Sequence, residues 1–370
     1  MSVNQQTLVQ QAIAMRQQYA MTSRELVAGP FGNIAYATNG KGSIPIPNGF
    51  LLSGITAHVH LPVTLNLNAL AAPALSSVGI SSVIEEVYLN YNGSESTLFS
   101  GDGIFVEQRE AMEYPSSNGA NADSIPTPSG TGTNYTYDWY FDVPNTYSLL
   151  TLMGVLNMNS QSNNAFMGVR WGDVSNLFVL GSGQTATVSG GYIEFIARRQ
   201  AQPTNPAVDG LPDLSKEYFV SYQDFPLNSS GYNRLDIKAD HTITRMTVNL
   251  LSGSLGNGSD VAAYDYANSL QLTNVKFGWA SLINKMDDVP YWYFQQEAAK
   301  NYGTSFSKWL NAGTVVLEMD KTNGRDWINA YDVTNLAIQL QLAAAPPAGS
   351  RARVYIEQII NTSSDIPIRG

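Results

Sequence analysis

The stretch Tyr-Ile-Glu-Phe-Ile at residues 192–196 returns, with one change, as Tyr-Ile-Glu-Gln-Ile at residues 355–359. Upstream of each copy lies a second echo, Gln-Arg-Glu-Ala at 108–111 and Gln-Gln-Glu-Ala at 295–298. Two echoes in the same order indicate a duplication, and their separation is far longer than the ~20–50 residues of a solenoid repeat. The sequence therefore predicts two copies of a whole domain.

The length and composition agree with two globular domains. The chain of 370 residues is long enough for two domains of about 100–200 residues each. It is 44% hydrophobic but only 14% charged, well below the ~25% charge of typical soluble domains. Its polarity is carried by neutral side chains, which is common where much of the surface contacts other protein. The net charge of −10 gives no basic footprint, so we expect no direct binding to nucleic acid.

Several classes of site are excluded by residues that are missing. The sequence has no cysteine, which rules out disulfides, thiolate metal sites and cysteine nucleophiles. The first residues lack the basic and apolar regions of a signal peptide, and no apolar run approaches the ~18 residues of a membrane span. We therefore expect synthesis in a cytoplasm, without a signal peptide.

The first residues differ from everything after them. Residues 3–24 contain no Gly or Pro and are rich in Gln, Ala, Met and Leu, which are good helix formers. Gly29 and Pro30 are expected to end this helix, which gives a helical arm over residues 1–28. Its apolar side chains form one stripe at helical spacing, the predicted interaction surface: Leu8, Val9, Ala12, Ile13, Met15 and Tyr19.

Beyond the arm the pattern is that of β-strands. Apolar side chains alternate with polar ones from Ile55 to Leu67, which predicts a half-buried strand or a bent pair. Pro62 within this run indicates an edge strand or a bulge. The same alternation occurs at 135–141, 315–319 and 338–342. Both copies of the repeated pentapeptide lie in β-branched and aromatic runs that are typical of strands.

The remaining segments divide the chain. The 108–111 and 295–298 echoes predict short helices, the second beginning at Asp287, Asp288 and Pro290 and ending at Gly303. Residues 116–134 predict a surface loop, and the Pro- and Gly-rich residues 202–213 predict a linker.

We thus expect an all-β protein in which two tandem jelly-roll β-sandwiches form a double jelly roll, with an N-terminal amphipathic helix and short inserted helices. The two sandwiches are predicted to span residues 29–201 and 214–370, on either side of the linker.

The pair His58 and His60 is the best candidate for a metal site, because cupin jelly rolls begin their metal sites with such a pair. A cupin also needs a carboxylate shortly after the pair, where Thr64 and Leu65 stand here. The third histidine, His241, lacks the expected Pro/Gly turn. These residues therefore predict two histidines on the polar face of a strand, and no bound metal or cofactor.

No catalytic constellation stands out. No Gly-x-Ser-x-Gly elbow surrounds any serine, and Asp287 with Asp288 is explained by the helix macrodipole. Asp320 and Asp326 flank a turn between strands. The aromatic residues 291–294 could bind sugar, but at the start of a packed helix they are more typical of core. We expect no catalytic residue, and hence no enzyme.

Taken together, these features resemble the major capsid proteins of tectiviruses, in the double-jelly-roll lineage that includes adenovirus hexon. The resemblance rests on the glutamine-rich segment 5–18, on Asn-Gly-Phe-Leu-Leu at 48–52, and on residues 139–148 and 154–161. It implies homotrimers whose six jelly rolls form a pseudo-hexagonal capsomer of an icosahedral bacteriophage virion with an internal membrane. It also implies that the arm contacts neighbouring capsomers, minor capsid or vertex proteins, and the internal membrane. The 116–134 loop would then face outward.

Two other classes of function remain open at this point. A jelly-roll glycan-binding virion spike or lectin-like protein would use exposed aromatic side chains and loops, but it gives the N-terminal helix no role. A two-domain glycan hydrolase or lyase would need a cleft with paired carboxylates.

Overall fold

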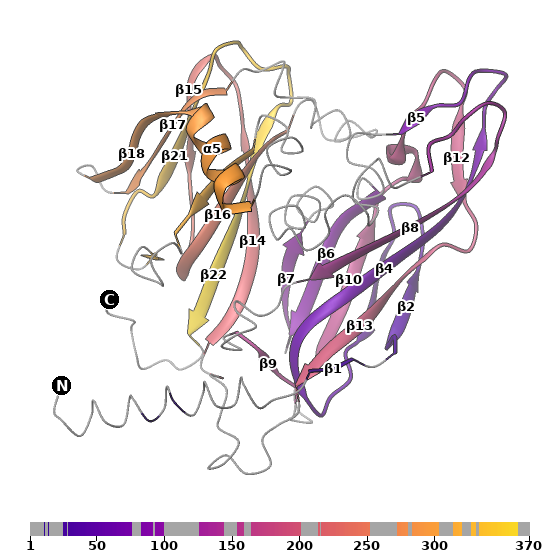
Figure 1. Ribbon diagram of the computed structural model, residues 1–370, viewed down its shortest axis with the longest axis horizontal. Helices are drawn as coiled ribbons and strands as arrows, with labels where there is room; N and C mark the ends of the chain where they lie inside the picture. Colours follow the sequence, from indigo (N-terminus) through magenta and orange to yellow (C-terminus); the bar gives the residue numbers. More distant parts are fainter. Residues whose placement is uncertain are drawn as a thin grey trace.

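The strands fall into two groups along the chain, one ending at Gln200 and the other beginning at Lys216. Figure 1 shows the computed structural model, with the two groups lying side by side. The structure describes residues 11, 14, 25–27, 29–75, 83–91, 93–99, 126–143, 154–158, 164–200, 214, 216–251, 272–279, 283–302, 314–319, 327–330 and 333–361.

The first group forms two main sheets. In one, β13 pairs with β4, β8 lies along the other edge of β4, and β1 and β2 follow each other along the free edge of β13. The other sheet has the order β3-β10-β6-β7. The elements are β1 (Glu25–Val27), β2 (Gly32–Ala35), β3 (Lys41–Pro45), β4 (Leu51–Asn66), β5 (Ala74–Leu75), β6 (Ile84–Tyr91), β7 (Ser94–Phe99), β8 (Asn134–Val143), β9 (Leu156–Asn157), β10 (Ala165–Trp171), the 3-10 helix η3 (Val174–Leu177), β11 (Phe178–Val179), β12 (Thr185–Val188) and β13 (Tyr192–Gln200).

The second group repeats this arrangement. One sheet has the order β14-β22-β16-β19 and the other the order β15-β21-β17-β18. The elements are β14 (Lys216–Pro226), β15 (Gly231–Asp236), β16 (Thr242–Leu251), β17 (Leu272–Trp279), β18 (Ile283–Pro290), α5 (Tyr291–Tyr302), β19 (Thr314–Glu318), β20 (Ile328–Asn329), β21 (Ala337–Leu342) and β22 (Arg351–Asn361).

Each group is a jelly roll, and the two have the same strand order. In one sheet, the first group has β2, β4, β8 and β13 where the second has β14, β16, β19 and β22, in chain order. In the other sheet, the first group has β3, β6, β7 and β10 where the second has β15, β17, β18 and β21. The repeated pentapeptides occupy equivalent positions, at the start of β13 and within β22. The predicted pair of tandem jelly rolls is confirmed.

Alternating burial builds one core inside each jelly roll. On β8, Tyr137, Trp139 and Phe141 are fully buried, and on β4 the odd-numbered side chains from Ile55 to Leu65 are buried. These residues join side chains of the opposite sheet in one cluster, while a second cluster fills the space between β16, β17, β19 and β21. The period-two pattern of the sequence thus predicted the inward faces correctly.

The two jelly rolls are in direct contact. Strand β7 lies against β14, and Gly154 forms an isolated parallel bridge with Glu217. Tyr218, Val220 and Tyr355 of the second group are buried within the first group's core cluster. The pair of domains therefore shares apolar surface and does not rely on the connecting segment alone.

Strand β4 is interior, so the edge position indicated by Pro62 is wrong. One side of β4 pairs first with β13, up to His60, and then with β12, from Val63. Pro62 falls in the interruption between these two partners, where its carbonyl accepts a hydrogen bond from the Ser189 amide at 3.3 Å. A proline is tolerated inside the sheet because the pairing changes partner at that point.

Two further expectations need correction. Residues Glu25–Val27 are β-strand β1 and pair with β13, so the helix does not continue to Gly29, and this part of the predicted arm belongs to the first jelly roll. Asp287 and Asp288 lie in strand β18, which precedes α5 directly. The acidic pair therefore does not cap the helix.

Several predicted features lie outside the described residues: the arm except Gln11, Ala14 and Glu25–Val27, the 108–111 echo, residues 116–125 of the loop, and the linker 202–213. The described end of the loop, residues 126–133, has no regular structure and, except for Pro128, is exposed. The division into arm, two jelly rolls and linker stays a prediction at its boundaries.

Candidate functional site

The interaction stripe predicted on the arm cannot be placed. Leu8, Val9, Ala12, Ile13, Met15 and Tyr19 all lie outside the described residues, although Gln11 and Ala14 beside them are helical and exposed. The described part of the chain instead brings together a polar cluster around the histidine pair.

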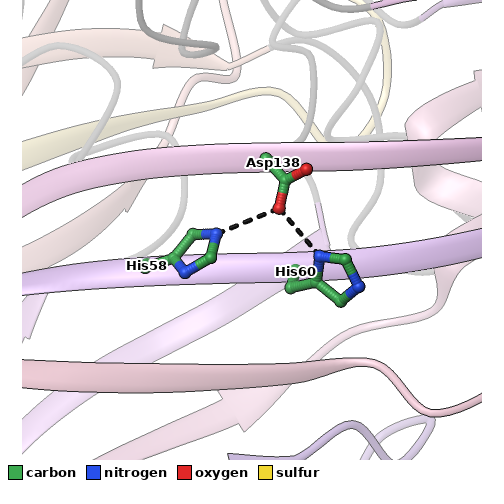
Figure 2. A group of neighbouring side chains, drawn as sticks. All are labelled: His58, His60 and Asp138. Carbon is green, nitrogen blue, oxygen red and sulfur yellow. Dashed lines mark hydrogen bonds and ion pairs between the residues drawn. The ribbon is translucent and has the colours of Figure 1, made fainter. Parts of the chain in front are cut away.

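This histidine cluster consists of His58 and His60 on β4, Asp138 on β8 and Glu194 on β13. Figure 2 shows Asp138 reaching across to both histidines. Asp138 Oδ1 lies 3.0 Å from His58 Nε2 and 2.8 Å from His60 Nδ1. On the other side of the same ring, His58 Nδ1 lies 2.8 Å from Glu194 Oε1. Strands that are far apart in sequence thus supply four titratable groups to one patch.

Strand register explains why these residues meet. His60 is directly opposite Asp138 on β8, and His58 is directly opposite Glu194 on β13. Because the odd-numbered residues of β4 point into the core, the even-numbered histidines share the outward face with Asp138 and Glu194. Asp138 was not among the residues predicted from the sequence; its polar position within the alternating run at 135–141 was the available signal.

The rings are held by aromatic neighbours. Tyr140 stacks on His58 with ring centroids 4.4 Å apart and planes within 10°, and the Tyr192 ring lies 5.2 Å from that of His60. Side-chain exposure is 16% for His58, 30% for His60 and 42% for Asp138. The cluster is therefore half-buried, ordered and open to solvent on the side of Asp138.

The histidines set the charge state of Asp138. Partial burial alone would raise the pKa of this carboxyl, but hydrogen bonds and attraction from His60 and His58 outweigh burial and hold its pKa below the ordinary value. Asp138 is therefore ionised at neutral pH and presents a carboxylate to both imidazoles.

The second jelly roll carries a different cluster at the equivalent place. Glu357, the counterpart of Glu194, forms an ion pair with Arg245 of β16 and accepts a hydrogen bond from the Tyr218 hydroxyl at 2.7 Å. Its side chain is only 11% exposed and that of Arg245 14%. The repeated glutamate thus joins the same two strands in both halves, with histidine as the partner in one and arginine in the other.

The other candidate residues are dispersed. Burial lowers the pKa of His241, against the opposing effect of Asp240, and this histidine belongs to the second jelly roll at the start of β16. Asp288 accepts hydrogen bonds from the Tyr232 hydroxyl and from Asn274 Nδ2, while Asp287 lies 3.6 Å from Lys276 Nζ. Asp320 and Asp326 lie outside the described residues.

The aromatic run at the start of α5 is divided between core and surface. Tyr291 and Phe294 are buried, as expected for a packed helix, whereas Trp292 is 61% exposed and Tyr293 38% exposed. The interpretation as core thus holds for two of the four residues.

Within the described residues, no helix combines the length and the apolar character needed to cross a membrane.

Comparisons with known proteins identify relatives by structure alone. No protein-family model and no curated protein matches the sequence. Among solved structures, the STIV MCP superposes with a TM-score of 0.64 at 12% identity, over 94% of this chain and 99% of that chain. The major capsid protein P2 from Bacteriophage PM2 gives 0.55 at 11% identity, over 93% and 99%. The PBCV-1 virus capsid gives 0.57 at 11% identity, over 91% and 94%.

These superpositions cover both jelly rolls and not a single sandwich, because each spans more than nine-tenths of both chains. At such low identity the likeness concerns the fold. The chain has the double jelly-roll fold of viral major capsid proteins.

Proposed function

We propose that this chain is the major capsid protein of an icosahedral virion and has a structural, non-enzymatic role. The observation that carries the proposal is the pair of equivalent jelly rolls packed directly against each other, in an arrangement that superposes over nearly the whole length of three capsid proteins. A function that used only one jelly roll would not require both jelly rolls to superpose on capsid proteins.

The assembly unit in this proposal is a homotrimer. Three chains with two similar jelly rolls each present six similar edges around one axis, which suits hexagonal packing of capsomers in a shell. Closed three-fold symmetry also limits association to a defined size. Large apolar side chains are available for such contacts, since Leu26 and Val27 on β1 and Trp292 on α5 are more than half exposed.

The proposed partners are other copies of the chain, neighbouring capsomers and minor capsid or vertex proteins. The tectivirus-like form of the proposal adds a bacteriophage host and an internal membrane contacted by the N-terminal arm. Because the chain has a net charge of −10, a membrane between coat and genome would separate like charges. Direct binding to nucleic acid is not part of the proposal.

A glycan-binding spike is the second candidate, and the exposed Trp292 and Tyr293 favour it, because aromatic side chains at a surface can stack on sugar rings. A projecting receptor-binding protein would bind glycans as an isolated oligomer and would not form shells. The two candidates therefore differ in whether the full chain assembles into shells and in whether it binds glycans.

Deletion of residues 1–24 tests the proposed function. The cut stops before Glu25 because Glu25–Val27 pair with β13, so we expect a folded trimer, lighter only by the deleted residues. Without the arm these trimers are expected not to form shells, as judged by electron microscopy under conditions where the full chain assembles.

Paired substitutions on the arm provide the control. Leu8→Ser with Ile13→Ser on the predicted apolar stripe is expected to reproduce the assembly defect. Gln10→Ser with Gln17→Ser, at positions that helical spacing predicts opposite this stripe, is expected to leave assembly intact. Normal shells from the deleted chain would contradict the role of the arm, and so would loss of the trimer.

A further inference from the structure

The two ring nitrogens of His58 each face a carboxylate oxygen, Glu194 Oε1 at 2.8 Å and Asp138 Oδ1 at 3.0 Å. A neutral imidazole carries a single N–H and can donate to only one of these oxygens. At the other contact a nitrogen lone pair would face an oxygen lone pair. A positive charge is therefore required between His58 and one of the carboxylates, either a second proton or a metal ion.

The geometry favours Glu194 as the acceptor of the single imidazole proton. Glu194 is directly opposite His58 in the sheet, and its side chain is less exposed than that of Asp138, 25% against 42%. A histidine that donates Nδ1–H to a carboxylate has its Nε2 lone pair fixed and made more basic, which is the usual surrounding of a metal-ligating histidine. The Nε2 of His58 then points at Asp138, beside His60.

We propose that His58, His60 and Asp138 bind a zinc ion, with Glu194 orienting His58 and solvent occupying the remaining position. The candidate ligand atoms of the three residues lie within 4.8 Å of one another. Two imidazoles and one carboxylate with an open fourth position are a donor set that zinc sites use.

Charge balance points to a divalent cation. Asp138 and Glu194 contribute two negative charges, and neutral histidines contribute none. Among the residues that the structure describes, neither carboxylate forms an ion pair with a lysine or an arginine. The nearest such pair along this face joins Arg198 to Asp142. A divalent ion would leave the cluster neutral.

Admitting the ion requires the candidate ligand atoms, which lie within 4.8 Å of one another, to adopt nearly equal separations. Tetrahedral zinc at its usual bond lengths separates its ligand atoms by about 3.3 Å, against the 2.8 and 3.0 Å that separate Asp138 Oδ1 from the two imidazoles. Asp138 is the most exposed of the three side chains, so its carboxylate can move away from the imidazoles by the difference between these separations. The ring of His58 keeps its place under Tyr140.

The consequence is a cross-link within the sheet. The ion would join β4 to β8 and, through Glu194, fix β13 as well. Binding to the folded state alone would stabilise the first jelly roll. The inference does not depend on the proposed capsid role.

Zinc titration of the purified full-length chain, after removal of metals with a chelator, tests this proposal. Titration calorimetry is expected to detect one bound zinc ion per chain. Thermal unfolding is expected to show a higher Tm with zinc than without it. His60→Gln and Asp138→Asn are each expected to abolish measurable binding at this site, and Glu194→Gln to weaken it about 10–100-fold. His241→Gln is the matched control, because it replaces the remaining histidine of the sequence and is expected to bind zinc as the unmodified chain does.

A variant that fails to fold would also fail to bind zinc, so a second measurement uses the unmodified chain. Addition of zinc is expected to shift the imidazole NMR signals of His58 and His60 but not those of His241. The proposal is overturned if zinc does not bind, or if its affinity is the same in the His60→Gln variant. Signals showing that His58 is doubly protonated at neutral pH and unaffected by zinc would assign the required charge to a proton instead.

Discussion

Replacing Glu357 with alanine is expected to lower the free energy of unfolding by about 3–5 kcal/mol, because it removes one partner of a largely buried ion pair. Arg245 is 14% exposed and forms an ion pair with the Glu357 carboxylate, which is 11% exposed. The hydrogen bond that the Tyr218 hydroxyl donates to Glu357 would be lost at the same time. This glutamate therefore holds β14, β16 and β22 together through polar contacts.

The equivalent substitution in the first jelly roll provides a control for this prediction. Glu194→Ala is expected to cost only about 1 kcal/mol in metal-free protein, since Glu194 is more exposed than Glu357 (25% against 11%) and its partner His58 keeps a hydrogen bond to Asp138. Both variants can be compared by urea denaturation at one protein concentration, with a chelator present. Equal losses would show that the duplicated glutamate acts through the backbone context of the pentapeptide and not through its charged partner.

Replacing Phe141 with alanine is expected to cost about 3–5 kcal/mol, since it removes a large side chain from a filled core and leaves a cavity. Phe141 is fully buried, its ring centroid lies 4.8 Å from that of Trp139, and it is directly opposite Ala57 on β4.

Tyr140 is the matched control on the same strand. It points to the outward face and is 44% exposed, so Tyr140→Ala is expected to cost less than about 1 kcal/mol even though it removes the stacking on His58. The comparison uses the midpoint of thermal or urea unfolding. A similar loss from both substitutions would contradict the assignment of the inward face of β8.

The sequence predicted those parts of the fold that depend on local periodicity. Alternation along 55–65 and 135–141 predicted the inward faces of β4 and β8, and the repeated pentapeptide predicted two equivalent strands, β13 and β22. The alternation, and each copy of the pentapeptide, lies within one strand and does not depend on which strand pairs with it. A period of two fixes which side chains face the core, whatever the strand pairs with.

Features that depend on pairing partners could not be predicted in this way. Pro62 indicates an edge only if one neighbour spans the whole strand, whereas β13 and β12 share that side of β4. Glu25–Val27 is too short a strand to have a period, and its two apolar side chains are exposed. Asp287 and Asp288 suit a helix start by their charge, yet β18 continues to Pro290.

The histidine cluster illustrates the same limit at a candidate site. The pair His58 and His60 was visible in the sequence, but the carboxylate of Asp138 is brought to it by the register between β4 and β8. The long connection between those strands does not determine this register. Sequence spacing could therefore exclude a cupin-like arrangement but could not find the ligand that the fold provides.

The measurement that tests the central claim most directly is the native mass of the purified full-length chain, by size-exclusion chromatography with light scattering. The capsomer proposal predicts a single species of about 120 kDa, three times the 40.2 kDa of one chain. A monomer whose mass stays near 40.2 kDa across the accessible concentrations would contradict a preformed trimer and with it the proposed building block of the shell.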